Sequence, residues 1–171
     1  GETISTVMPL YGNEAEWDKL SIVFATSHGS VRRNKLSDFT NVRSNGKIAM
    51  KLDEGEALVG VKMCTPDQDI LLATKYGKCI RFQASDVREF AGRTSTGVRG
   101  IKLGKDEVIS ISILDHVSFS IEERDAYLRM SRQRRGQSDD EFVPEKTTEV
   151  VPQITLSEER YAELAAQEQF I

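Results

Sequence analysis

The sequence has few of the residues on which catalytic, metal-binding or membrane-spanning proteins depend. Of its 171 residues, two are cysteine, two are histidine, one is tryptophan and four are proline. Cys64 and Cys79 do not have metal-ligand or redox spacing, so we expect two reduced thiols in a cytosolic protein. No stretch of 18 apolar residues is present, which argues against a membrane span, and the first residues lack the basic and apolar regions of a secretory signal.

No catalytic constellation is visible either. His28 and His116 have no partner at metal-ligand spacing, and no phosphate-binding loop is present. The glycines at 97 and 100 are explained by a tight loop at the start of a strand rather than by nucleotide binding. The sequence therefore predicts no catalytic residue, metal or cofactor within this chain.

The chain instead repeats itself with a period of 48 residues. Segment 22–38 (IVFATSHGSVRRNKLSD) is echoed by segment 70–86 (ILLATKYGKCIRFQASD), and Arg33 and Arg81 occupy equivalent positions. After a short insertion the echo continues, because 45–52 (NGKIAMKL) matches 96–103 (TGVRGIKL). A period near 50 residues is typical of blade or solenoid arrays.

Each repeat is predicted to contain four short β-strands. Apolar, partly β-branched runs are separated by Gly-containing turns, as hairpins require. Four strands per unit is the pattern of a propeller blade. We therefore predict a mainly β fold of propeller-like blades of four antiparallel strands, with strands near 22–26, 31–35, 48–52 and 58–63, and again near 70–74, 79–83, 98–103 and 108–114.

The C-terminal third has a different character. Ser120-Ile-Glu-Glu123 is a capping box that predicts a helix to about Arg135. Residues 136–154 have linker composition, and a second helix is expected from about Leu156. The expected segments are a connecting segment (1–20), two blade repeats (21–66 and 67–114) and a small α-helical insertion of two helices (115–171).

The net charge of −4 conceals a division between these segments. The first 20 residues carry a net charge of −3, and the insertion carries −6. The repeats have fifteen basic and ten acidic residues, a net charge of +5. A basic repeat region beside an acidic appendage suggests an anionic partner for the repeats.

The segments Asn45-Gly-Lys-Ile-Ala-Met-Lys-Leu52 and Thr96-Gly-Val-Arg-Gly-Ile-Lys-Leu103 each close a unit of this strand pattern. In this setting they resemble the C-terminal domain of the DNA gyrase A subunit, over roughly residues 5–114. The C-terminal domain of the topoisomerase IV A subunit is a weaker match. Segment 115–171 resembles an insertion found between blades in gyrases of some bacterial groups. Residues 133–136 copy only the first four letters of the family's signature box, Gln-Arg-Arg-Gly-Gly-Lys-Gly.

The resemblance implies a β-pinwheel, a six-bladed disc in which neighbouring blades exchange a strand. Its basic rim bends duplex DNA, which supports ATP-dependent negative supercoiling by the holoenzyme, a bacterial type II topoisomerase and isomerase. This chain would be about two blades plus the insertion. The implied partners are double-stranded DNA and, in a heterotetramer, the gyrase B subunit together with the rest of the gyrase A subunit. ATP and Mg are expected elsewhere in the holoenzyme, and the location is cytoplasmic and nucleoid-associated, with no membrane partner.

Cations that recur at equivalent positions, such as Arg33 and Arg81, would form a track for DNA phosphates without base readout. Lys51 and Lys102 also recur, but solvation of strand edges explains them equally well. A propeller-like protein-interaction scaffold, with the acidic insertion as its partner surface, is the alternative, and salt dependence distinguishes the two. The residues predicted to contact DNA are Arg32, Arg33, Lys35, Arg43, Lys47, Lys78, Arg81, Arg93 and Arg99.

Overall fold

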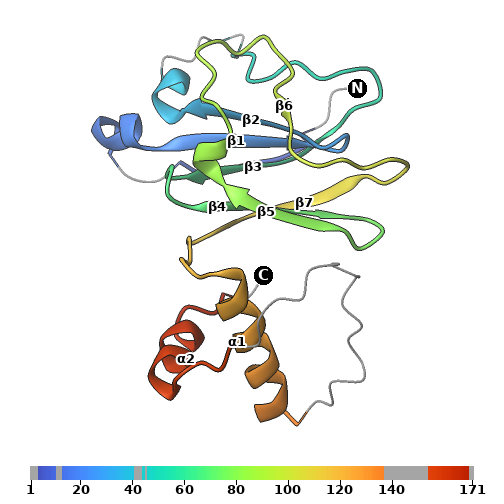
Figure 1. Cartoon of the computed structure of the whole chain (residues 1–171). Coiled ribbons are helices and arrows are strands. Elements are labelled where there is room, and N and C mark those ends of the chain that lie inside the picture. The colour runs from blue at the N-terminus through green and yellow to red at the C-terminus, as the bar shows by residue number, and fades with distance from the viewer. Residues whose placement is uncertain (1–3, 11–12, 41–43, 45, 137–153, 170–171) are drawn as a thin grey trace. The chain divides into compact units, whose positions relative to one another are not determined.

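The structure is a computed structural model that describes residues 4–10, 13–40, 44, 46–136 and 154–169. The chain forms two compact units, Gly1–His116 and Val117–Ile171 (Figure 1). No helix of the described residues is long and apolar enough to cross a membrane.

The first unit contains two antiparallel sheets, one with strands from both repeats and one with strands from the second repeat (Figure 1). The strand order is β3-β1-β2-β6 in one sheet and β5-β4-β7 in the other. The predicted mainly β fold is confirmed, including strands across both 22–26 and 70–74. The strands are β1 (Ser21–Thr26), β2 (Ser30–Lys35), β3 (Leu58–Cys64), β4 (Asp69–Thr74), β5 (Cys79–Gln83), β6 (Val98–Arg99) and β7 (Val108–Leu114).

The fourth strand of the first sheet comes from the neighbouring repeat, as the strand exchange implied by the resemblance requires, and not from within one repeat as the repeat pattern predicts; the second sheet has three described strands. The first repeat supplies three strands of its sheet, and β6 from the second repeat is the fourth, pairing Arg99 with Ser30 and Val98 with Val31. Residues 48–52, predicted to be a strand, have no regular structure, and the strand predicted at 98–103 is limited to β6. The prediction failed because pairing with the adjacent repeat, rather than β propensity alone, decides whether this motif becomes a strand.

Strand β1 is buried on both faces, which explains its continuous apolar run. Val23 and Ala25 point into the core between the two sheets, together with side chains of β4 and β7. Ile22 and Phe24 alternate with them and pack on the opposite face against Trp17. A strand with period-2 alternation and apolar residues at every position must be covered on both sides.

Strand β6 can approach β2 closely because it lies between two glycines, Gly97 before it and Gly100 after it. A Cβ atom at Gly97, where φ is +109°, would lie 2.6 Å from the Val31 carbonyl oxygen. A Cβ atom at Gly100 would lie 2.6 Å from Val31 Cγ2. The Gly100 N–H donates to the Gly29 carbonyl at 2.8 Å. The spacing Gly-x-x-Gly is therefore explained by close packing of one repeat on the other.

The second unit contains two helices, α1 (Ile121–Arg134) and α2 (Glu158–Ala165) (Figure 1). The predicted capping box is confirmed, because Ser120 Oγ accepts from the Glu123 N–H and the Glu123 carboxylate accepts from the Ser120 N–H. The Tyr127 and Tyr161 rings stack with centroids 5.0 Å apart. Most of the segment predicted to be a linker, 136–154, lies outside the described residues.

Candidate nucleic-acid interface

Arg32 is fully buried in the first unit, with 0% of its surface exposed. Its guanidinium donates hydrogen bonds to Asn34 Oδ1 at 2.8 Å, to Ser95 Oγ at 2.7 Å and to the carbonyl oxygen of Gly92. It also lies over the Phe90 ring, 4.6 Å from the centroid. These contacts join β2 to the loop that follows β5, so Arg32 has a structural role.

Burial, and secondarily the nearby Arg88 cation, lowers the pKa of Arg32 below its ordinary value. A guanidinium surrounded by neutral oxygens and an aromatic face has no access to a phosphate. The expectation that Arg32 contacts DNA is therefore corrected. When several charged residues are adjacent in a short strand, the sequence does not show which of them is buried at the interface between the two repeats.

The recurrent arginines, Arg33 and Arg81, have equivalent internal roles. Arg33 is 8% exposed, donates to the Val87 carbonyl at 2.8 Å and to Ser21 Oγ at 3.2 Å, and lies 3.8 Å from Glu89 Oε2. Because Arg33 is buried, it is not one of the exposed cations, and the expectation that it contacts a DNA phosphate is corrected.

Arg81 reaches the equivalent position on its own hairpin. Its Nε donates to Asp69 Oδ2 at 2.7 Å, and Asp69 occupies in the second repeat the place of Ser21 in the first. The Asp69 side chain is only 6% exposed, whereas that of Arg81 is 34% exposed. The charge of Arg81 is thus largely compensated within the fold, and packing explains why an arginine recurs here.

Besides Arg81, three of the predicted DNA-contacting residues are exposed cations, namely Lys35, Lys78 and Arg99. Among the described residues, none accepts a hydrogen bond from the side chains of Lys35 or Arg99. Lys78 acts on Asp106 only through space, where its charge helps to lower the pKa of that carboxyl. These three side chains are available to an anionic partner.

Lys47 and Arg93 are half-buried and converge on one acceptor. The Lys47 ammonium donates to the Asp38 carbonyl oxygen at 2.7 Å, and the Arg93 guanidinium donates to the same oxygen at 3.2 Å. A backbone carbonyl does not neutralise a charge, so both cations retain their field. Arg43 lies outside the described residues.

The exposed cations do not form one set. Lys78 and Arg99 lie near the hairpin turns, because Arg99 pairs with Ser30 at the start of β2 and Lys78 precedes β5. Lys35 ends β2, which places it at the other end of the sheet (Figure 1). A strand of six residues spans about 20 Å, so a ligand that contacts both groups must be extended.

The acids at the hairpin turns are held by the fold. The Glu56 carboxylate accepts from the Thr26 hydroxyl and from the Asp53 N–H. Burial acts to raise the pKa of Asp106, but hydrogen bonds from the Thr74 hydroxyl and from the Glu107 and Tyr76 N–H groups outweigh it, and the pKa lies below its usual value. Backbone and hydroxyl donors therefore hold these two carboxylates in place, and the charge of Asp106 still interacts with that of Lys78.

Other exposed cations of the first unit were not among the residues predicted to contact DNA. Lys105 follows Gly104 in the loop before β7, and Lys62 lies on β3. Lys51 and Lys102 occupy equivalent positions in the two repeats, and both are exposed, so this recurrent pair of cations lies at the surface. Arg88 is exposed, and its guanidinium lies 4.2 Å from the Phe90 centroid.

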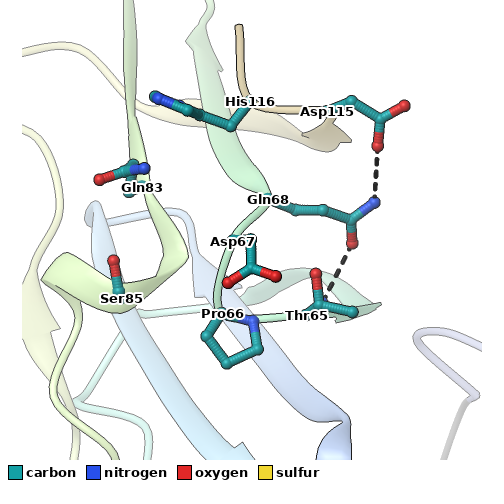
Figure 2. Close-up of a pocket in the computed structure, with 8 residues that line it drawn as sticks. All are labelled: Thr65, Pro66, Asp67, Gln68, Gln83, Ser85, Asp115 and His116. Carbon is teal, nitrogen blue, oxygen red and sulfur yellow. Dashed lines mark hydrogen bonds between the residues drawn. The ribbon is translucent and has the colours of Figure 1, made fainter. Parts of the chain in front are cut away.

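A cavity of about 520 Å³ lies at the opposite end of the second sheet from its hairpin turn. Gln68 bridges it, donating to Asp115 Oδ1 at 3.0 Å and accepting from the Thr65 N–H at 3.0 Å (Figure 2). His116 Nδ1 lies 3.0 Å from Asp69 Oδ1. With two acidic residues and no lysine or arginine in its lining, this cavity is unsuited to phosphate.

The residues that copy the start of the family's signature box, 133–136, belong to the end of α1. Arg134 pairs with Glu158 and lies 3.9 Å from the Tyr161 centroid, and Arg135 pairs with Glu168 at 3.0 Å. These arginines form exposed ion pairs with residues in and after α2, and their charge is favourable to the dipole at the C-terminus of α1.

Both repeats match a known protein family. The family model described as the DNA gyrase C-terminal domain, a β-propeller, matches residues 21–65 and 68–115. The chain belongs to this family. Residues 116–171 lie outside the matched ranges.

Relatives match over nearly the whole chain. The DNA gyrase A subunit of Granulibacter bethesdensis is 50% identical over 98% of this chain, and that of Rickettsia bellii is 44% identical over 99%. Each match covers 19% of the relative, so the chain spans about a fifth of these gyrase proteins. The match to the DNA gyrase A subunit of Staphylococcus epidermidis covers 68% of the chain.

Solved structures support the fold. The C-terminal domain of DNA topoisomerase IV matches with a TM-score of 0.54 at 22% identity, covering 57% of this chain and 31% of that chain. A DNA gyrase A C-terminal domain matches with a TM-score of 0.51 at 24% identity, covering 57% of this chain and 32% of that chain.

Proposed function

We propose that the first unit of this chain binds duplex DNA without sequence preference and helps to bend it, within the C-terminal domain of a gyrase A subunit. The observation that carries the proposal is the match of both repeats to the DNA gyrase C-terminal family. The supporting observation is that the side chains of Lys35, Lys78 and Arg99 are exposed and donate no hydrogen bond to the residues that the structure describes.

In this proposal the contacts are made to phosphates. Lysine and arginine side chains on the surface of a sheet neutralise the DNA backbone and release its counterions, but they do not read base edges. Lys47 and Arg93 supply a second group of cations, and Lys51, Lys102 and Lys105 extend the first. Arg43 remains a proposed contact.

The wider activity is also a proposal. In the holoenzyme, DNA bent over this domain would be handed to a strand-passage machinery formed by the gyrase B subunit together with the rest of the gyrase A subunit. ATP and Mg²⁺ would act there rather than in this chain. The relatives compared above are gyrase proteins, which favours gyrase over topoisomerase IV as the parent enzyme.

The test is the salt dependence of binding to a fluorescent duplex, followed by anisotropy. If Lys35, Lys78 and Arg99 alone each neutralise one phosphate, the slope of log K against log salt is about −2.7, and affinity falls roughly fortyfold between 50 and 200 mM salt; each further cation that contacts a phosphate adds about −0.9 to the slope. The double variant Lys78→Glu with Arg99→Glu should reduce the slope by about 1.8.

The matched control is Lys19→Glu, which changes one exposed charge in the 3₁₀-helix Glu14–Lys19, outside the matched family ranges. It should leave the slope unchanged. An unchanged slope in the double variant, with its melting temperature preserved, would refute the proposal. Binding of a protein partner through the second unit would instead persist at high salt, as the scaffold alternative requires.

A further inference from the structure

Tyr76 is an exposed aromatic residue at the tip of the hairpin that joins β4 to β5. It is 71% exposed, whereas the phenylalanine and tryptophan rings of the first unit, among the residues that the structure describes, are buried or half-buried. The hairpin tip and the loop that precedes β7 lie at the same end of the second sheet (Figure 1). A ring of this size, exposed at a loop tip, is available to a ligand.

Backbone hydrogen bonds fix the position from which this ring projects. The Tyr76 N–H donates to Asp106 Oδ1 at 3.1 Å, and the Lys75 N–H donates to the Glu107 carbonyl at 3.0 Å. Gly77, which follows in the turn, has a φ of +84°, the left-handed conformation that closes many short hairpins. The tip is thus held in place before any ligand binds, which lowers the entropic cost of a contact made there.

The first repeat shows that this position stays exposed when another repeat packs beside it. His28 occupies the equivalent place, at the tip between β1 and β2. The Gly100 N–H donates to the Gly29 carbonyl at 2.8 Å, and a Cβ atom at Gly29 would lie 3.0 Å from Ile101 Cγ2, so the second repeat packs directly on this tip. His28 is nevertheless exposed. A repeat that packs on the second hairpin in the same way would leave Tyr76 exposed as well.

The charges beside the two tips differ. Residues 26–30 contain no lysine or arginine, and the loop 53–57 that contacts them has three acidic residues. At the second tip, Lys78 is exposed, and so is Lys105, which precedes the Asp106 that accepts from the tip backbone. An exposed ring between exposed cations is the combination with which proteins hold a nucleic-acid backbone and stack on a base. The second tip therefore suits DNA better than the first.

We propose that the Tyr76 ring inserts at a base step of the duplex and partly unstacks it, while Lys78 and Lys105 contact the adjoining phosphates. The inference rests on the proposed function, because it assigns to one side chain a kink in the DNA that the first unit bends. Inserted side chains kink a duplex, and unstacking costs least where the bases are mismatched. Every base has a π face, so stacking is compatible with binding without sequence preference.

The test compares two duplexes of equal length, one fully paired and one with a central mismatch, each with 2-aminopurine at the centre. The parent chain should bind the mismatched duplex on the order of tenfold more tightly, with a rise in 2-aminopurine fluorescence as the base unstacks. Tyr76→Ala should lose both the preference and the rise, but keep the salt slope, because no phosphate contact is removed. Tyr76→Phe should retain the preference and the rise.

The matched control is Phe119→Ala, which removes an exposed aromatic ring outside the matched family ranges and should behave as the parent does. Equal melting temperatures would show that Tyr76→Ala is folded. A parent chain that binds with the expected salt slope, but without the mismatch preference or the fluorescence rise, would overturn this inference and leave the proposed function standing. So would a preference that persists in Tyr76→Ala. A parent chain that binds neither duplex at low salt would overturn both.

Discussion

Gly46 and Gly97 are a matched pair of positions for measuring how much the pairing of β6, a strand of the second repeat, with β2 of the first repeat contributes to stability. Both glycines have positive φ and occupy the same position in the repeat motif. Only Gly97 of the two has a neighbouring strand among the described residues, since its Cβ would lie 2.6 Å from Val31 O, 3.1 Å from the Val31 carbonyl carbon and 3.3 Å from Arg32 Cβ. We compare Gly97→Ala with Gly46→Ala.

The left-handed backbone should cost each alanine roughly 1–2 kcal/mol, partly offset by about 0.4–1 kcal/mol from the less flexible unfolded chain. Gly46→Ala should therefore lower the free energy of unfolding by about 1 kcal/mol. Gly97→Ala adds an overlap with backbone atoms that cannot rotate away. Overpacking of this kind costs about 1–3 kcal/mol, so the total should be about 3 kcal/mol.

The assay is thermal and urea unfolding of the chain. At about 4 °C for each kcal/mol, Gly97→Ala should lower the melting temperature by about 12 °C and Gly46→Ala by about 4 °C. Equal losses in the two variants would refute the reasoning, because backbone strain alone, without strand packing, would then account for both.

Two further predictions concern buried groups. Arg32→Met should lower the free energy of unfolding by about 3 kcal/mol, since it leaves the carbonyl of Gly92 and the side chains around it without donors, while the salt slope of DNA binding of the folded protein stays unchanged; a reduced slope would show that Arg32 contacts DNA. Burial raises the pKa of the Cys64 thiol to about 11, although the Arg33 cation opposes it, so a thiol reagent should label Cys79 alone in the folded chain. Because the folded pKa is raised, this contribution to stability is present below the unfolded pKa and is lost as the pH rises from about 9 toward 11, which urea unfolding across that range would detect.

Local patterns predicted most of the elements. Strands β1, β4 and β7 are apolar runs of strand length, and turns with glycine separate β1 from β2 and β4 from β5. The capping box at Ser120 marks the start of α1 because two reciprocal hydrogen bonds stabilise it. These signals depend on neighbours in sequence, so a single sequence contains them.

The roles of the arginines could not be read in the same way. Arg32 and Arg33 are buried by residues 87–95, which arrive from the other repeat more than 50 positions away. Recurrence of Arg33 at Arg81 looked like a surface track, yet it reflects an internal bond to Ser21 or Asp69. Burial of a charge depends on which segment covers it, and period-2 alternation contains no information on that.

The transfer of β6 also determines how this region can unfold. The boundary between repeats in the sequence, near residue 66, does not separate two folding units, because the first sheet is incomplete without residues 98–99. Loss of the second repeat would expose the edge of β2 and remove the Ser95 and Gly92 acceptors of the Arg32 guanidinium. The two repeats should therefore melt in one cooperative transition. A duplication that adds a blade must add both a strand equivalent to β6 and a strand edge, like that of β2, with which such a strand pairs.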